Sequence, residues 1–338
     1  MTSLRRLAPL AAAAVLALTA CSSADTSSTD ATEDAVSIAL VRQLGSGDYF
    51  EQWLSGAQAQ ADELGVDLTV FNADGDDAQQ ATDLDSAIGQ DFDAIIVDHG
   101  FAETIQPGIL SALDADIPLV AFDVDPGDDR AITVEQSDYA LAEAVLGQLV
   151  EDTGGQAQVI YAYVSGYAPL DRRNEIWEDV KAENTGLEQV AQIGVVNDNT
   201  AAEVADQAKA ALQANPEVTA IFAPYDEFAK GATLAVQELG LEDTVTVYGA
   251  DISTADIEVI VADDSPWVAT AATDPSNVGA VSVRAAYLAA TGGEVDQTLT
   301  IEPVLITQEQ LRDAGVTTIQ DLTAAVPELT TPDIAPVE

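Results

Sequence analysis

The chain has 338 residues, 47% of them hydrophobic, and a formal net charge of −48 that comes from 59 acidic and 11 basic residues. This length exceeds what one ordinary core needs, so we expect two domains. So acidic a surface repels phosphates and anionic lipids, which excludes nucleic-acid partners; the acid excess is explained better by a solvating surface than by a specific cationic partner.

The amino terminus has the plan of a secretory signal. Arg5 and Arg6 give it a positive start, and residues 7–18 form an apolar run that is too short to span a membrane as a mature helix. Residues 18–21 (Leu-Thr-Ala-Cys) resemble the lipobox of bacterial lipoproteins, in which the cysteine is lipidated and becomes the first residue. Cys21 is the only cysteine, so a disulfide-based fold is excluded, and a free thiol after an ordinary signal is the alternative.

We therefore predict a lipoprotein signal peptide over residues 1–20 and lipidation at Cys21. Residues 21–35 are rich in Ser, Thr, Asp and Ala without periodicity, which predicts a disordered tether. The expected location is outside the cytoplasm, lipid-anchored on the outer face of the bacterial cell membrane.

From Val36 onward, apolar strand patterns alternate with amphipathic helix patterns. The first strand is predicted over 38–41, followed by a loop with Tyr49 and Phe50 and by a helix that Gly65 ends. The other predicted strands are 67–71, 94–97, 118–122, 134–137, 159–164, 190–195, 219–223, 245–249, 267–272 and 299–306. The other predicted helices are 77–88, one ending at Leu113, 139–150, 173–183, 201–214, 228–239, 274–290 and a short one after Gln308.

This alternation predicts an α/β fold with two doubly wound parallel-sheet lobes joined by hinge crossovers. The predicted N-terminal lobe comprises 36–136 plus 274–303, and the C-terminal lobe 137–273 plus 304–325, with 326–338 as a tail. Such sheets bind ligands beyond the carboxyl ends of their strands, and two lobes can close around a ligand by hinge motion.

Several short motifs occur in an order that is similar to one known family. They are 48–50 (Asp-Tyr-Phe), 117–123 (Ile-Pro-Leu-Val-Ala-Phe-Asp), 215–223 (Asn-Pro-Glu-Val-Thr-Ala-Ile-Phe-Ala) with Asp226-Glu227 and Gly231-Ala232 behind it, 249–251 (Gly-Ala-Asp) and 271–279. Between residues 36 and 306 the chain thereby resembles the sugar-binding proteins of bacterial ABC importers, the ribose-binding type of periplasmic binding protein.

The resemblance implies a monomeric binding protein that captures a monosaccharide or related polyol and delivers it to an ABC permease. It also implies nine ligand-binding residues, namely Tyr49, Phe50, Asp98, Asp123, Arg173, Asn199, Tyr225, Asp251 and Thr273. Four positions depart from the family pattern: Val124 stands for an Arg, Asp98 and Tyr225 each for an Asn, and Asn199 for a Phe. The type of site therefore transfers, and the identity of the sugar does not.

In such a site carboxylates accept hydrogen bonds from sugar hydroxyls, Arg173 donates them, and Tyr49, Phe50 or Tyr225 packs on the ring. Three carboxylates and one Arg give a net negative pocket. That charge suits a polyol, disfavours sugar phosphates and acids, and leaves an amino sugar or a nucleoside-like ligand as alternatives.

Structural roles compete with each of these assignments. Asp123 and Asp251 could be helix N-caps, as Asp226 and Glu227 are expected to be, and Tyr49 and Phe50 could pack on their own lobe. Arg173 could form a surface ion pair with Glu175 or Glu178, and the adjacent Arg172 could serve in its place. For His99, the only histidine, a structural role at the rim is favoured over ligand contact.

An enzyme is the main rival by class. One histidine and one cysteine leave no Ser-His or Cys-His machinery and no Cys/His zinc site, and no carboxylate pair is singled out for glycoside hydrolysis. Segment 45–47 lacks the further glycine of a dinucleotide site, and 72–77 has the composition of a calcium loop with a misplaced glycine. We predict no enzyme, no cofactor and no metal; a receptor that signals to a sensor remains the second reading.

Overall fold

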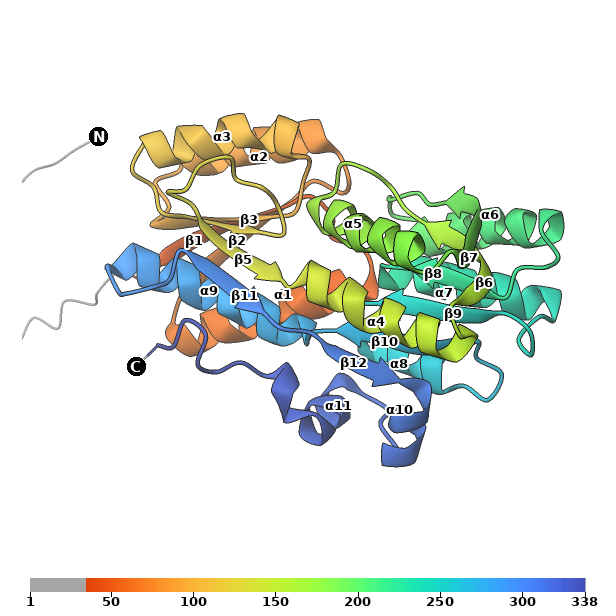
Figure 1. Cartoon of the computed structure of the whole chain (residues 1–338). Coiled ribbons are helices and arrows are strands. Elements are labelled where there is room, and N and C mark those ends of the chain that lie inside the picture. The colour runs from red at the N-terminus through yellow and green to blue at the C-terminus, as the bar shows by residue number, and fades with distance from the viewer. Residues whose placement is uncertain (1–34, 338) are drawn as a thin grey trace, which may run out of the picture. The chain divides into compact units, whose positions relative to one another are not determined.

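The computed structural model describes residues 35–337, which form two sheets with helices on both faces (Figure 1). The predicted signal peptide, Cys21 and all of the predicted tether except its last residue lie outside the described residues. Both sheets are dominated by parallel pairing, so the predicted α/β fold class is confirmed.

The first sheet is parallel throughout and has the strand order β11-β5-β4-β3-β1-β2. Its strands are β1 (Ser37–Arg42), β2 (Asp67–Asn72), β3 (Ala94–Asp98), β4 (Leu119–Phe122), β5 (Ile132–Gln136) and β11 (Thr298–Ile301). The central strand β1 alternates between two cores, because Ile38 and Leu40 face one side while Ala39 and Val41 face the other. Because it is buried on both faces, the middle of this strand, residues 38–41, is a continuous apolar run.

Four helices cover this sheet: α1 (Asp48–Leu64), α2 (Asp77–Ile88), α3 (Ala102–Asp114) and α9 (Pro275–Thr291). Helices α1 and α9 pack on the face of Ile38, and α2 and α3 on the face of Ala39 (Figure 1). Helix α1 turns Trp53, Ala57 and Ala61 into the core at helical spacing. It ends at Gly65, which takes a left-handed conformation.

The second sheet has the order β12-β10-β9-β8-β6-β7, with β12 antiparallel to β10 and all other pairs parallel. Its strands are β6 (Gln156–Ala162), β7 (Gly186–Ile193), β8 (Ala220–Ala223), β9 (Thr246–Ala250), β10 (Trp267–Ala272) and β12 (Val304–Thr307). Its helices are α4 (Asp138–Thr153), α5 (Ala168–Glu183), α6 (Thr200–Ala214), α7 (Asp226–Leu239), α8 (Thr254–Val261), α10 (Gln308–Ala314) and α11 (Ile319–Ala325), before a 3₁₀ turn, η1 (Pro327–Leu329). Helices α4 and α5 share one core with the sheet, and α6 and α7 share the other.

The chain passes between the two sheets three times. The first passage runs from β5 through Ser137 to α4, the second from β10 through Thr273 to α9, and the third from β11 through Pro303 to β12. The carboxyl ends of parallel strands from both sheets face the region of these passages, where loops of the two halves meet.

Several predictions were wrong in detail. Tyr49 and Phe50 were predicted in a loop but lie in the first turn of α1. The last strand was predicted as one run, 299–306, but the chain divides it between the two sheets as β11 and β12. The strand predicted over 190–195 begins at Gly186, helix α5 begins five residues before Arg173, and α8 was missed. The tail has two short helices and a 3₁₀ turn where one helix was predicted.

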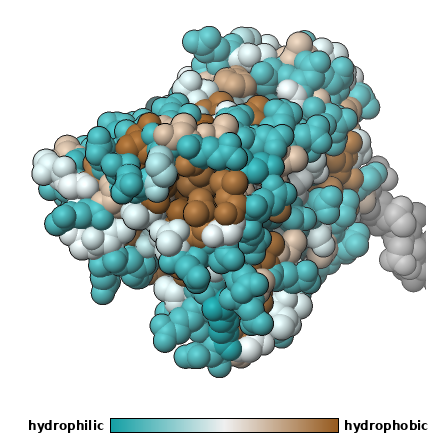
Figure 2. All heavy atoms as spheres, turned by 90° about the vertical axis from the view of Figure 1, so that its right-hand side faces the viewer, coloured by the Kyte–Doolittle hydropathy of each residue, from teal (hydrophilic) through white to brown (hydrophobic). Residues whose placement is uncertain are grey.

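Hydrophilic side chains cover most of the end of the molecule that carries α6 and α7, around one apolar patch (Figure 2). Among the large hydrophobic side chains of residues 35–337, only Leu110, Tyr139 and Leu234 are more than a third exposed. No helix in the same range combines the length and apolar character that crossing a membrane requires.

The contact between α1 and α9 depends on two glycines. A Cβ added at Gly56 would lie 2.0 Å from the carbonyl oxygen of Ser276, and one at Gly279 would lie 2.2 Å from that of Trp53. We expect Gly56→Ala to lower the free energy of unfolding by about 1–3 kcal/mol, because the helix backbones must separate. Chemical denaturation measures the change.

The matched control is Gly147→Ala in α4, where an added Cβ meets nothing within 4 Å. This substitution should raise the free energy of unfolding by about 0.5–1 kcal/mol, because alanine loses less conformational entropy than glycine in a helix. Equal effects of the two substitutions would contradict the close packing of α1 on α9.

Candidate ligand-binding site

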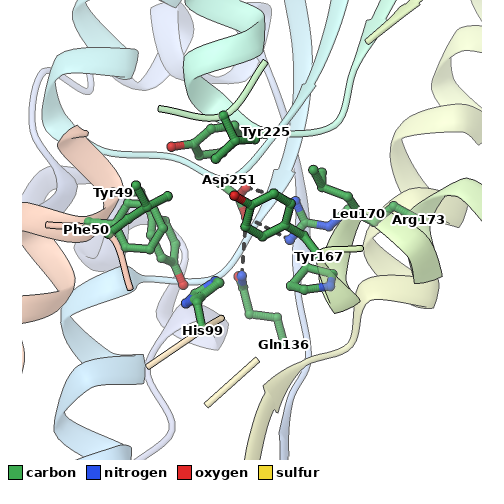
Figure 3. Close-up of a pocket in the computed structure, with 12 residues that line it drawn as sticks. Tyr49, Phe50, His99, Gln136, Tyr167, Leu170, Arg173, Tyr225 and Asp251 are labelled. Atoms are coloured by element: carbon green, nitrogen blue, oxygen red, sulfur yellow. Dashed lines mark hydrogen bonds and ion pairs between the residues drawn. The ribbon is translucent and has the colours of Figure 1, made fainter. Parts of the chain in front are cut away.

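A small cavity of about 50 Å³ lies between the strand ends of the two sheets (Figure 3). The first half of the molecule supplies Leu44, Tyr49, Phe50, His99 and Gln136, and the second half supplies Tyr167, Pro169, Leu170, Arg173, Val196, Tyr225 and Asp251. Nearly all of these residues follow the carboxyl end of a strand or begin a helix.

A buried ion network centred on Arg173 forms one wall. Arg173 donates to Asp138 (2.7 Å), to both carboxylate oxygens of Asp251 (2.9 and 3.2 Å) and to the carbonyl of Pro224 (2.8 Å). Asp251 also accepts from Gln136 (3.3 Å), whose side-chain oxygen accepts from Thr273 (2.5 Å). Burial lowers the pKa of Arg173, but the Asp251 and Asp138 carboxylates outweigh burial and raise that pKa above its ordinary value.

A second chain of charged groups holds His99. Arg42 donates to Asp98 (2.9 Å), whose other oxygen lies 2.6 Å from Nδ1 of His99. The other ring nitrogen, Nε2, lies 3.9 Å from Asp123. Burial lowers the pKa of His99, but the hydrogen bond and charge of Asp98 and the charge of Asp123 together raise it. His99 thus has both a structural anchor and a surface in the cavity.

Asp123 carries an unusual protonation equilibrium. Burial and the nearby Asp138 carboxylate raise the pKa of Asp123 to about 7, against the opposing charges of His99, Arg172 and Arg173. Asp123 Oδ2 and the hydroxyl of Tyr49 are buried and make no hydrogen bond within residues 35–337. Buried polar atoms are nearly always paired in folded proteins, so these two atoms have unused hydrogen-bonding capacity beside the cavity.

Three of these residues have left-handed backbone conformations: His99 (φ +59°), Asp123 (φ +49°) and Asp251 (φ +69°). Each follows the end of a strand, where the left-handed conformation redirects the side chain. Non-glycine residues in this region store strain that concentrates at functional sites. The strain therefore coincides with the charged side of the cavity.

The rest of the wall is apolar. Leu44, Leu170 and Val196 line it together with the rings of Phe50 and Tyr225, whose centroids lie 6.4 Å apart. Figure 3 shows Tyr225 on the opposite side of the residue group from His99 and Gln136. The cavity is consequently amphipathic, with a polar side and an apolar side.

Five of the nine predicted ligand-binding residues line the cavity: Tyr49, Phe50, Arg173, Tyr225 and Asp251. Asp98 and Asp123 flank His99, and Thr273 lies behind Gln136. Asn199 is exposed at the N-cap of α6 and is not among the lining residues. Ligand contact by each of the nine remains a prediction.

The competing structural roles can be compared with the contacts. Neither Asp123 nor Asp251 is an N-cap, because α8 is capped by Ser253 and no helix begins beside Asp123. The ion-pair partners of Arg173 are Asp138 and Asp251 rather than Glu175 or Glu178, and Arg172 pairs with Asp138.

Sequence reasoning missed Leu44, Gln136, Tyr167, Pro169, Leu170 and Val196. Leu44 and Val196 follow strand ends, where ligands of such sheets are expected to bind. Pro169 lies in the first turn of α5 and signals the start of a helix. With this signal, Tyr167 and Leu170 could have been predicted to lie at the cavity.

The acidic loop before α2 has a local structural role. Asp76 caps α2 by accepting from the backbone nitrogens of Ala78 and Gln79, and Asn72 donates to Asp74. Among residues 35–337 no group of three or more His, Cys, Asp or Glu side chains is arranged to hold a metal ion.

Comparison with known proteins gives consistent matches. Residues 38–294 match the family model described as periplasmic binding protein domain. The ribose import binding protein of Escherichia coli is 25% identical over 91% of this chain and 100% of its own length. The xylitol-binding protein of Mycolicibacterium smegmatis is 27% identical over 71% and 68%, respectively.

A solved structure is closer in sequence. The 5-methylthioribose transporter solute binding protein of Thermotoga lettingae, in complex with 5-methylthioribose, is 42% identical, with a TM-score of 0.85. The match covers 87% of this chain and 93% of the Thermotoga chain.

The titration of Asp123 and His99 predicts how stability changes with pH. The pKa of Asp123 is raised from 3.8 to about 7, so the folded state binds more protons than the unfolded state between these values. The pKa of His99 is raised from 6.5, so its contribution is complete below pH 6.5 and is lost as pH rises through its folded pKa. Both groups make stability fall as pH rises, and we expect the melting temperature of the ligand-free protein to decrease from pH 5 to pH 8.

Asp123→Asn should flatten this decrease, because it removes one of the two titrating groups and one of the charges that raise the pKa of the other, His99. Asp129→Asn is the matched control, since it removes one carboxylate from an exposed position. Thermal unfolding followed by circular dichroism measures both slopes, and a slope unchanged in Asp123→Asn would show that Asp123 does not take up a proton on folding.

Proposed function

Since the chain belongs to the periplasmic binding protein family, as a ribose-binding-like protein of type I fold, we propose that it captures a monosaccharide or related polyol outside the cytoplasm and delivers it to an ABC importer. The relatives are substrate-binding proteins of importers and not enzymes. We propose that 36–136 with 274–303 and 137–273 with 304–325 are the two lobes of a monomer and that the lobes close over the ligand.

The observation that carries the proposal is the cavity between the two sheets, with hydrogen-bonding groups on one side. Asp123 Oδ2 and the Tyr49 hydroxyl have no partner, and a sugar hydroxyl can donate to the first and bond the second. Asp251 and Gln136 supply further polar atoms at the cavity wall. Few such bonds are needed, because bonds to charged groups are about twice as strong as neutral ones.

The charges favour a neutral ligand over an amino sugar. Arg173 neutralises Asp251 through two hydrogen bonds, and burial raises the pKa of Asp123 to about 7, which reduces the negative charge at neutral pH. A sugar phosphate would face the Asp251 carboxylate without a free cation among the lining residues, because Arg173 and His99 are already paired with carboxylates.

The apolar side narrows the ligand class further. A sugar with hydroxyls on its whole rim would leave one of them unpaired against Leu44, Val196 and Tyr225. A pentose with a small apolar group in place of its terminal hydroxyl would fill both sides. We propose 5-methylthioribose, the sugar bound by the Thermotoga relative, as the representative ligand.

Calorimetry and thermal-shift measurements on a ligand panel test this proposal. We expect 5-methylthioribose to bind with a Kd of about 1 μM or lower and to raise the melting temperature, because it binds only the folded state. Ribose should bind about 10–100-fold more weakly, since its 5-hydroxyl is buried unpaired. Ribose 5-phosphate should not bind, and xylitol tests the polyol class.

Val196→Thr tests the apolar side of the cavity, and Val195→Thr is its matched control. Both replace one methyl group by a hydroxyl, but only Val196 lines the cavity. Val196→Thr should weaken 5-methylthioribose several-fold more than ribose, whereas Val195→Thr should leave both affinities unchanged. Equal binding of ribose and 5-methylthioribose by the unaltered protein would reject the substituted sugar and leave the general sugar class; binding of no sugar or polyol would reject that class.

We further propose that residues 1–20 are removed and that Cys21 is lipidated, so that residues 21–35 tether the protein to the outer face of the membrane. The support is the sequence Leu-Thr-Ala-Cys behind a basic and apolar leader. In a bacterial host, Cys21→Ser should lose metabolic labelling with a fatty acid and move from the membrane to the soluble fraction. Ser22→Ala is the control that should keep both properties; unaltered protein without label would exclude the anchor.

A further inference from the structure

A second, polar cavity adjoins the ligand cavity, and one side chain lines both. The second cavity has a volume of about 290 Å³. Its lining residues are Ser46, Gly47, Asp48, Asn197, Asp198, Thr200, Ala201, Tyr225, Glu227 and Lys230. Leu44 and Val196 line the ligand cavity, and the residues that follow them closely in the chain line the polar cavity, so the two spaces are neighbours with Tyr225 as their shared wall.

The orientation of Tyr225 is that expected of a wall between the two cavities. Tyr225 is the N-cap of α7, directly after β8, and its ring packs edge-on against Phe50 and Phe228, with centroids 6.4 and 5.1 Å away. A Cβ built on Gly47 would lie 3.5 Å from the Tyr225 hydroxyl and 3.5 Å from a carboxylate oxygen of Glu227. The hydroxyl therefore reaches the polar cavity, whereas the ring faces apolar neighbours.

Charged groups that join the two halves of the molecule close the polar cavity. Lys230 pairs with Asp48 and with Glu227, and Ser46 donates to Asp198 at 2.7 Å. These groups are unsuitable neighbours for an apolar substituent, because burying an alkyl chain against them costs their solvation. An apolar group on the ligand thus has room up to the Tyr225 ring and no apolar path beyond it.

We propose that Tyr225 determines the length of the ligand: its ring admits a methylthio group on the sugar and blocks longer chains. This inference rests on the proposed function, because it assigns the apolar side of the same cavity to the substituent. It also gives a role to the tyrosine at position 225, where the family pattern has an asparagine. A side chain smaller than tyrosine leaves space beside Phe50 and Phe228 that a longer substituent can occupy.

The test uses a series of pentoses that carry methylthio, ethylthio, propylthio and butylthio groups at carbon 5. Calorimetry gives the Kd of each for the unaltered protein, Tyr225→Phe and Tyr225→Ala. The unaltered protein should bind the butylthio sugar at least about tenfold more weakly than the methylthio sugar, because the extra methylenes collide with the ring. Tyr225→Phe should keep this ratio, since it keeps the ring.

Tyr225→Ala should reduce or abolish the ratio, because the extra methylenes can then occupy the space of the ring beside Phe50 and Phe228, where each buried methylene is worth up to about fourfold in affinity. Tyr167→Ala is the matched control: Tyr167 lines the ligand cavity but not the polar one, so its loss should weaken all four sugars without changing their ratio. If thermal unfolding shows that Tyr225→Ala is not folded, Tyr225→Leu replaces it in the same measurement.

The outcomes separate this inference from the proposed function. A ratio in Tyr225→Ala or Tyr225→Leu equal to that of the unaltered protein, or the same change in Tyr167→Ala, would overturn the role of Tyr225 while the sugar class stands. Failure of the unaltered protein to bind any of the four sugars, with ribose or xylitol still bound, would remove the substituted-sugar class and this inference with it. Failure to bind any sugar or polyol would remove the proposed function itself.

Discussion

The buried network around Arg173 is the interaction on which the site depends. Arg173 satisfies two carboxylates at once, Asp138 and Asp251, so neither charge is left uncompensated in the interior. The network then continues through Gln136 to Thr273. Gln136 and Asp138 flank the first passage between the sheets, and Thr273 forms the second, so the wall of the cavity and the connections between the halves share one set of hydrogen bonds. A ligand that contacts this wall therefore contacts side chains that are hydrogen-bonded across two of the passages between the sheets.

Most of the fold could be predicted from the sequence because buried parallel strands leave a strong apolar signal, as in 94–97 and 118–122. The apolar signal failed for one strand at the edge of a sheet and for one short helix. Strand β7 carries Glu188, Gln189 and Gln192 at the border of its sheet, so polar residues hid its first half and the prediction moved to the apolar 190–195. Helix α8 has only eight residues, too few for periodicity to stand out.

Positions at strand ends could be predicted to surround a ligand, and five of the nine residues that the family resemblance implied do line the cavity. The pattern does not reveal which of two consecutive side chains turns inward: His99 lines the cavity, whereas Asp98 holds it from behind. That choice is made by the left-handed backbone at His99, which no periodicity encodes. The ion pairs of Arg173 were likewise beyond prediction, because Asp138 and Asp251 come from distant parts of the chain.

The division of the last strand-forming run between two sheets affects the order in which the protein can be completed. Strand β11 adds to the edge of β5, and β12, four residues long and just beyond Pro303, adds to the edge of β10. During synthesis from the amino terminus, both sheets lack one edge strand until residues 298–307 emerge, although the other strands of the first sheet are made much earlier. A chain cut short before residue 298 ends its sheets at β5 and β10, and these unpaired strands invite aggregation.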